Sequence, residues 1–171
     1  MLVVLEGPDG VGKTVLSQKL KGIGSVMYAP LPRVDSYNNR EDWQRFIDVF
    51  GKSDNIYILD RCFLSEFVYR LFDKNDTYMT FHDVANWLDA CAAVVICRSD
   101  TAYEDAMNRG EDNITDRAKH IKITEMYEHV IHMIKRFTKV PVIDYCWKTM
   151  TDTEIKKLIK QTINNHWLTA D

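Results

Sequence analysis

The sequence predicts an α/β fold in which five parallel strands form a doubly wound sheet flanked by helices. Short apolar runs alternate along the chain with segments whose apolar residues recur at the helical period. The runs are continuous and rich in valine and isoleucine, which is typical of parallel strands covered on both faces. Elements that alternate in this way pack as a sheet between helical layers. With 171 residues and no linker or repeat, the whole chain, 1–171, is expected to form one domain.

Five apolar runs are expected to form the strands. Seven glycines and four prolines fall mainly between the apolar segments, where they mark turns and helix boundaries. The strands are expected over Leu2–Leu5, Ser25–Ala29, Ile56–Leu59, Ala93–Cys97 and Val140–Ile143.

The segments between these runs have helical periodicity. Glu41–Phe50 has apolar residues at positions i, i+3, i+4 and i+7, and Lys119–Phe137 has one apolar stripe along its length. Thr151 precedes Glu154 by three residues, which is the pattern of a capping box, so the last helix begins there and runs toward His166. Further helices are expected over Thr14–Lys21, Phe63–Phe72 and Thr80–Ala90.

Composition excludes several classes of protein. Lysine and arginine total 22 against 25 acidic residues, and a net charge of −3 argues against a nucleic-acid-binding surface. The four cysteines form no CxxC pair, and the five histidines show no metal-binding or triad pattern. The longest apolar run, Ala90–Cys97, is far shorter than the ~20 residues of a membrane helix. The glycine-rich N-terminus does not resemble a signal peptide, so we expect a cytoplasmic protein with reduced cysteines.

The loop after the first run contains a complete phosphate-binding motif. Residues 7–14 read Gly-Pro-Asp-Gly-Val-Gly-Lys-Thr, which matches GxxxxGK[ST] between an apolar strand and an amphipathic helix. The pattern predicts a P-loop NTPase type of sheet that binds ATP through converging backbone N–H groups. Lys13 is expected to bridge the β- and γ-phosphates, and the Thr14 hydroxyl to bind Mg²⁺. The expected nucleotide-binding residues are Gly7, Asp9, Gly10, Val11, Gly12, Lys13 and Thr14.

An acid followed by a base stands directly after the third expected strand. Asp60 lies where ligands bind in open α/β sheets, and we expect it to hold Mg²⁺ through water. Arg61 can place its guanidinium fork on a phosphate group. The alternative is a simple ion pair at the end of the strand. The first interpretation predicts a kinase that holds a second, phosphorylated or hydroxylated substrate.

Two segments resemble the thymidylate kinase family. The stretch Leu5–Thr14 is similar to the FEGxDGxGKT pattern of that family, and Asp60–Ser65 is similar to its DRxxxS segment. The resemblance implies a five-stranded parallel core with a mobile lid, and transfer of the ATP γ-phosphate to a deoxynucleoside monophosphate. It also implies that Asp9 contacts the sugar of the acceptor, that Arg61 contacts its phosphate, and that the protein forms a homodimer. Cys62 stands where the family commonly has an aromatic residue, the segment after the second strand lacks the REPGG pattern of bacterial members, and the chain is shorter than typical members. Together these departures favour a compact, phage-type relative.

Further candidates for the acceptor site lie on two helices. Ser65, Glu66 and Tyr69 follow Arg61 at helical spacing. On the helix before Asp60, Trp43 and Phe46 are suited to stacking a base, and Arg45 is suited to binding a phosphate. The alternative is that this aromatic pair packs in the core. The expected substrate-binding residues are Asp9, Trp43, Arg45, Phe46, Asp60, Arg61, Ser65 and Tyr69.

A polar segment at about 109–118 is the expected lid. It contains a glycine and two arginines, Arg109 and Arg117, which could neutralise the charge that develops during transfer. Lys119 and Lys122 are weaker candidates, and a solvated charged loop is the alternative. The expected catalytic residues are Lys13, Asp9, Arg61, Arg109 and Arg117.

The choice of acceptor depends on a carboxylate. A nucleoside 5′-hydroxyl needs a positioned base, which related deoxynucleoside kinases place just after the second strand. Here no acid follows that strand until Asp35, which favours an acceptor that is already ionised. We therefore expect a deoxynucleoside monophosphate kinase. A deoxynucleoside kinase is the nearest alternative, and a non-catalytic nucleotide-binding regulator is an alternative of another class.

Overall fold

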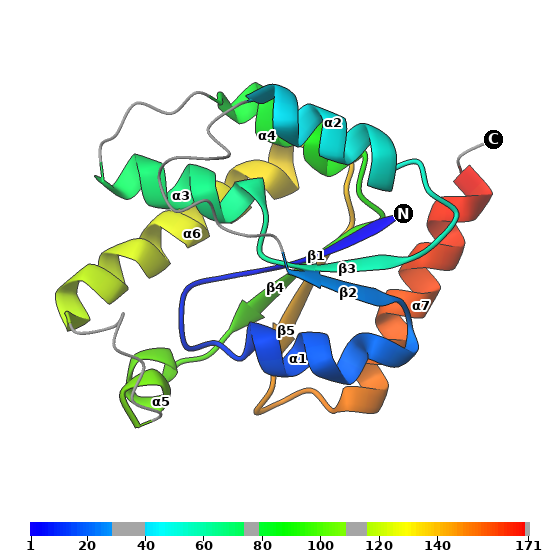
Figure 1. Cartoon of the computed structure of the whole chain (residues 1–171). Coiled ribbons are helices and arrows are strands. Elements are labelled where there is room, and N and C mark those ends of the chain that lie inside the picture. The colour runs from blue at the N-terminus through cyan, green and yellow to red at the C-terminus, as the bar shows by residue number, and fades with distance from the viewer. Residues whose placement is uncertain (29–39, 74–78, 109–115, 170–171) are drawn as a thin grey trace.

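The computed structural model of the chain describes residues 1–28, 40–73, 79–108 and 116–169. Its centre is a five-stranded sheet with the strand order β2-β3-β1-β4-β5, in which every pair of neighbours is parallel (Figure 1). This confirms the expected α/β class with five parallel strands. The strands are β1 Leu2–Glu6, β2 Ser25–Tyr28, β3 Tyr57–Asp60, β4 Ala93–Arg98 and β5 Val142–Cys146.

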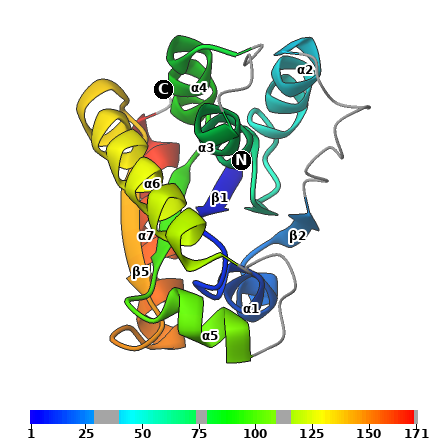
Figure 2. The ribbon, with the colours of Figure 1, turned by 90° about the vertical axis from the view of Figure 1, so that its left-hand side faces the viewer.

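Helices cover both faces of the sheet because neighbouring residues of a strand point to opposite sides. In β1, Leu2 and Val4 belong to one apolar cluster, whereas Val3 and Leu5 belong to the other. The first cluster contains residues of α2 (Arg40–Phe50), α3 (Phe63–Asp73), α4 (Phe81–Asp89) and α6 (Arg117–Phe137). The second contains residues of α1 (Lys13–Lys19), of α7 (Asp152–Thr169) and of α5 (Ala102–Asn108), which Figure 2 shows beyond the carboxyl end of β4.

The strand register brings the chemistry-bearing residues to one edge of the sheet. Leu5 of β1 pairs with Asp60 of β3, and Glu6 pairs with Ile96 of β4. The carboxyl ends of the central strands therefore meet beside the loop that follows β1. In open α/β sheets this is the edge at which ligands bind.

Several expected element boundaries differ from the structure, and the larger differences are in β5, α1 and α6. The fifth strand begins at Val142 rather than at Val140 because Pro141, which has no N–H to donate, stands just before it. α1 ends at Lys19, and the chain continues as a short 3₁₀ turn over Leu20–Gly22. α6 begins two residues earlier than expected because the Asp116 side chain caps it by accepting hydrogen bonds from the backbone.

The structure also shows how long and how apolar the helices are, and in what state the cysteines are. Within the described ranges, no helix is both long and apolar enough to cross a membrane. The cysteines are free thiols, and burial raises the pKa of Cys91 and of Cys97 to about 12.

Candidate active site

The loop between β1 and α1 depends on glycine for its path. Gly10 has φ +84°, and a β-carbon on it would lie 2.2 Å from the backbone oxygen of Ala102 in α5. A β-carbon on Gly7, at φ +138°, would lie 2.4 Å from the backbone oxygen of Cys97 at the end of β4. A side chain at either position would collide with backbone, so the loop can pass this close to β4 and α5 only with glycine. The loop after β1 therefore depends on the glycines that the phosphate-binding motif specifies.

Lys13 lies inside this loop. Its side chain is only 5% exposed, and its ammonium donates to the backbone oxygens of Gly7 at 2.7 Å and Pro8 at 2.5 Å. A buried ammonium needs such partners because an unpaired charge is costly away from water. The lysine side chain thus reaches across the loop, and its ammonium lies against the backbone of that loop.

Glu6 connects the end of β1 to the beginning of α3. This carboxylate is fully buried, and Oε1 accepts hydrogen bonds from the backbone N–H groups of Cys62 at 2.8 Å and Ser65 at 3.2 Å. Oε2 accepts from the Ser65 hydroxyl at 2.5 Å and from the Tyr127 hydroxyl at 3.4 Å. An anion at a helix N-terminus also interacts favourably with the helix dipole. Glu6 therefore fixes α3 relative to the phosphate loop.

The same network corrects the expected role of Ser65. Its side chain is completely buried, and its hydroxyl contacts Glu6 and, at 2.8 Å, Tyr127. Burial raises the pKa of Tyr127 well above its usual value, and the nearby Glu6 charge raises it further. Ser65 thus positions the start of α3 and has no surface for a direct contact with substrate.

Three of the expected residues come together beside the loop. The Arg61 guanidinium forms an ion pair with the Asp9 carboxylate, and the Tyr69 hydroxyl donates to Asp9 Oδ2 at 2.8 Å. We call Asp9, Arg61 and Tyr69 the Asp9 cluster. Burial raises the pKa of Tyr69 although Arg61 acts to lower it, so the phenol keeps its proton and donates. This cluster places a cation and a hydroxyl next to the phosphate loop.

The backbone of Arg61 is unusual. Among the described residues it is the one non-glycine residue with positive φ, at +69°, and its N–H donates to the backbone oxygen of Leu5 at 3.1 Å. Such conformations cost free energy and concentrate at functional sites. Asp60, which precedes it at the end of β3, is 6% exposed. The strained turn directs Arg61 back toward Asp9.

The expected residues of α2 lie elsewhere. Trp43 is buried in the apolar core, where its ring meets Phe63 edge-on at 5.5 Å between centroids. Phe46 packs between Trp43 and Phe50. Arg45 is exposed and lies within ion-pair distance of acidic residues of its own helix. No described contact brings any of the three expected residues to the Asp9 cluster, and the position of the aromatic pair matches the core-packing alternative.

The lid arginines are only partly described. Arg109 and the rest of the segment 109–115 lie outside the described residues. Arg117 begins α6 instead of lying in a loop, and Nη2 is 3.0 Å from Oε1 of Glu104 in α5. Its guanidinium also lies over the Tyr103 ring, 5.8 Å from the centroid. In this position Arg117 pairs with α5 rather than with the loop.

Sequence reasoning noted Glu66 only for its helical spacing with Ser65 and Tyr69, and it missed Arg70. Glu66 is 7% exposed, and its carboxylate accepts from Trp43 Nε1 at 3.0 Å and from Arg70 Nε at 3.1 Å. Both residues lie on α3 within three residues of Tyr69, so a partly buried charge pair adjoins the Asp9 cluster along this helix. The available signal was an acid in the middle of an apolar helix, with an arginine four residues later.

His120 was missed as well. It is 8% exposed, and its Nε2 lies 3.0 Å from the backbone oxygen of Asp9. Burial lowers the pKa of His120, and the Lys13 charge lowers it further, while Glu104 opposes the shift. The available signal was its place in the apolar stripe of α6, three residues before Ile123 and seven before Tyr127.

The loop after β5 reaches the phosphate loop from the other side. A β-carbon on Gly12 would lie 3.7 Å from the Trp147 ring, which is 48% exposed. Lys148 lies over this ring at 5.2 Å from the centroid and donates to the Thr101 hydroxyl. An exposed aromatic face is therefore available beside the start of α1.

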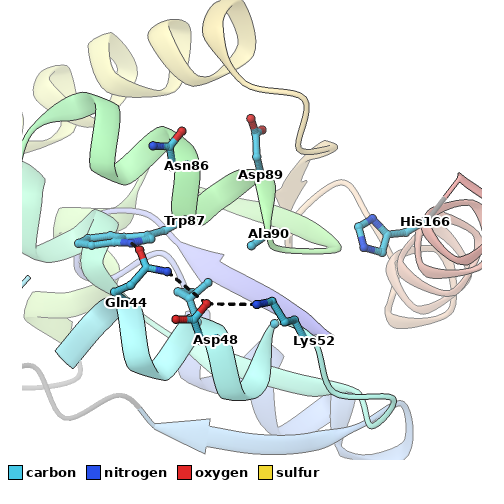
Figure 3. Close-up of a pocket in the computed structure, with 10 residues that line it drawn as sticks. Gln44, Asp48, Lys52, Asn86, Trp87, Asp89, Ala90 and His166 are labelled. Carbon is cyan, nitrogen blue, oxygen red and sulfur yellow. Dashed lines mark hydrogen bonds and ion pairs between the residues drawn. The ribbon is translucent and has the colours of Figure 1, made fainter. Parts of the chain in front are cut away.

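A pocket lies away from these residues, at the opposite edge of the sheet. It is near the ends of α2 and α4 and the starts of β3 and β4. It has a volume of about 290 Å³, and Figure 3 shows Gln44 of α2 against Trp87 of α4, with Asp48 of α2 and Lys52 of the following turn farther along and His166 of α7 at one side. Gln44 accepts from Trp87 Nε1 at 2.9 Å, and Asp48 pairs with Lys52 at 3.4 Å. None of the sequence-predicted site residues lines this pocket.

Comparison with known proteins shows what this fold resembles. No protein-family model matches the sequence, and no curated protein matches it significantly. The structure is similar to YorR from Bacillus subtilis, solved in complex with phosphorylated GDP, with a TM-score of 0.74, 20% identity and full coverage of both chains. It is also similar to deoxyadenosine kinase from M. mycoides with bound dCTP, with a TM-score of 0.60 and 20% identity over 96% of this chain and 100% of that one.

A third structure extends the likeness. Shikimate kinase from Acinetobacter baumannii in complex with shikimate matches with a TM-score of 0.53 and 10% identity over 99% of this chain and 94% of that one. The named enzymes among these neighbours are kinases, whereas the resemblance to thymidylate kinases in particular stays a prediction. Together with the glycine-dependent loop and Lys13, these likenesses show that the chain has the fold of P-loop kinases.

Proposed function

We propose that the protein transfers the γ-phosphoryl group of ATP to a deoxynucleoside monophosphate, giving a diphosphate and ADP. The observation that carries this proposal is the Asp9 cluster, which holds a guanidinium and a phenol beside the phosphate loop. The fold likeness to a deoxyadenosine kinase supports a deoxynucleotide as the kind of substrate. Cytoplasmic location and a homodimer remain predictions from the sequence.

The phosphate loop is the proposed ATP site. The Lys13 ammonium already lies against the backbone of this loop, and phosphate oxygens would replace the backbone oxygens of Gly7 and Pro8 as its partners. The exposed ring of Trp147 offers an apolar face for the adenine.

Oxygen donors suited to Mg²⁺ adjoin this loop. Thr14 is exposed at the start of α1, and Asp60 ends the neighbouring β3. Among the described residues, no group of three or more histidine, cysteine, aspartate or glutamate side chains could hold a metal. Mg²⁺ usually binds through one or two protein ligands together with substrate phosphates, which fits this donor set. When bound, Mg²⁺ would neutralise phosphate charge during transfer.

The proposed step breaks the bond between the γ-phosphorus and its bridging oxygen and forms a bond from that phosphorus to an acceptor phosphate oxygen. ADP leaves with the bridging electron pair. An ionised acceptor needs no base, so the residues act by position and charge. Arg61 would exchange part of its contact with Asp9 for the acceptor phosphate, and Asp9 and Tyr69 would then face the acceptor sugar.

A deoxynucleoside kinase is the second candidate. The deoxyadenosine kinase neighbour favours it, since the likeness covers 96% of this chain. Such an enzyme needs a carboxylate near the acceptor hydroxyl, and Asp9 would have to leave Arg61 to serve as that base.

A coupled assay of ADP release over a panel of deoxynucleosides and their 5′-monophosphates separates these candidates. We expect turnover with at least one monophosphate and none with the matching nucleoside. In Arg61→Ala, the KM for the monophosphate is expected to rise by at least about tenfold, while the KM for ATP changes little. Arg45→Ala is the matched control, because Arg45 is exposed on α2 and should leave both values unchanged.

The other outcomes are equally informative. Turnover with nucleosides alone would replace the proposal by the second candidate. ATP binding without turnover on any acceptor would favour a non-catalytic nucleotide-binding protein.

A further inference from the structure

We propose that His120 is a positioning residue for the acceptor site, and this inference rests on the function proposed above. Its imidazole holds the backbone carbonyl of Asp9, and it thereby fixes the carboxylate that binds Arg61 and Tyr69. Nε2 lies 3.0 Å from that carbonyl oxygen. Because a carbonyl can only accept, Nε2 carries the hydrogen and donates it.

Asp9 is held at both of its ends. His120 binds its backbone from α6, whereas Arg61 and Tyr69 bind its carboxylate from the turn after β3 and from α3. The next residue, Gly10, is pressed against the backbone of Ala102 and has φ +84°. The Asp9 carbonyl therefore lies between a crowded glycine and the His120 side-chain donor. Loss of that donor removes one of the contacts that set the orientation of this peptide and, with it, the position of the carboxylate.

Packing holds the imidazole in place. The Tyr103 ring of α5 meets the imidazole at 5.8 Å between centroids. The backbone N–H of His120 donates to the backbone oxygen of Asp116 at 3.0 Å, which fixes the first turn of α6 and so the point from which the side chain starts. The His120 residue is only 8% exposed. A side chain that is packed against α5 and aimed at the loop can transmit its position to that loop.

The charges around His120 keep it suited to this role. Lys13 of the phosphate loop disfavours a second positive charge, and Glu104 of α5 opposes that effect. Arg117, on the same helix, lies over Tyr103 and pairs with Glu104. A neutral imidazole donates from Nε2 without adding charge beside Lys13, so the contact does not depend on protonation.

Amide substitutions at this position test the donor. The side-chain N–H of His120→Gln reaches about as far as Nε2, whereas that of His120→Asn is too short to reach the Asp9 carbonyl. His120→Leu fills the space and donates nothing. We expect the acceptor KM to rise by about tenfold in the Leu and Asn variants, as for one lost hydrogen bond, and to return to within about threefold of wild type in the Gln variant. The KM for ATP should change by less than about threefold in all three.

Two results would overturn the inference. Equal acceptor KM values in wild type, Leu and Asn variants would mean that the histidine only fills space, and equal impairment of the Gln and Asn variants would mean that ring shape matters rather than the donor. Thermal unfolding of each variant shows whether it is folded. Wild type that turns over no monophosphate contradicts the proposed function instead, and calorimetric binding of the same monophosphates to wild type, Gln and Asn variants then decides the role of His120 separately.

Discussion

The two ends of the sheet hold their polar side chains in different ways. At the carboxyl end, Asp9 binds Arg61, Tyr69 and His120, which lie 52, 60 and 111 residues away in the chain. At the amino end, the pocket in Figure 3 contains the pair Asp48–Lys52, which joins residues four apart at the end of α2 and whose side chains are 51% and 80% exposed.

This difference separates structure-dependent contacts from local ones. An exposed i,i+4 pair forms on any helix and contributes a few tenths of a kcal/mol. A buried contact between distant segments exists only when the sheet is assembled, and it fixes the geometry of the residues that it joins. The carboxyl end thus has the fixed geometry that the proposed phosphoryl transfer would need, and the predictions below test whether function and stability follow the same division.

The largest effect is expected from Lys13→Ala. The variant removes the ammonium at the centre of the phosphate loop, and turnover should fall by at least about 10²-fold. The unfolding midpoint should change little, because Gly7 and Pro8 lose a buried donor but gain access to water. Initial rates with saturating ATP and acceptor, together with a thermal melt, measure both quantities. Activity near that of wild type would contradict the role assigned to Lys13.

A large loss of stability is expected from Glu6→Ala. The change leaves the backbone N–H groups of Cys62 and Ser65 buried without their acceptor, and the free energy of unfolding should fall by about 2–4 kcal/mol. Glu6→Gln keeps one acceptor oxygen and should lose less than half as much. Urea denaturation gives the two values. Equal values for both variants would show that the negative charge, rather than the hydrogen bonds, holds α3.

A smaller, pH-dependent effect is expected at His120. Its folded pKa is lowered, so the unfolded chain binds more protons as the pH falls below about 6.5, and the histidine destabilises the fold in that range. Above about 6.5 this loss is absent. His120→Gln cannot titrate, so wild type should lose more stability than the variant between pH 7.5 and pH 5. Parallel pH profiles of the unfolding midpoint for the two proteins would refute this.

The smallest effect is expected at the amino end. Asp48→Asn and Lys52→Gln break only the local pair, and the free energy of unfolding should stay within about 0.5 kcal/mol of wild type. Turnover and both KM values should also stay unchanged. A loss of activity comparable to that of the His120 variants would remove the distinction between the two ends of the sheet.

The sequence was most informative where patterns are local. The apolar runs located all five strands because each is continuous and lies between turn residues. The phosphate-binding motif and the DR pair located Asp9 and Arg61, and helical spacing from Arg61 located Tyr69. The structure brings these three residues together as the strand order requires.

The sequence was least informative where burial depends on the assembled fold. Trp43 and Phe46 have the same helical spacing whether they line a cleft or pack in the core, and only the position of α2 against α3 decides between these. The contacts that Glu66 and His120 make depend on how α3 and α6 pack beside the loop, which the sequence pattern alone does not show. Hydrophobic periodicity does not tell which polar residue in an apolar stripe has a partner.

The left-handed backbone at Arg61 has a consequence for how this protein would respond to selection. An L-residue in that conformation costs about 1 kcal/mol, and a glycine there would relieve the strain while leaving the N–H bond to Leu5 intact. The same change would remove the ion pair with Asp9 and the guanidinium that we propose for the acceptor, so selection for activity would keep arginine at this position despite its strain.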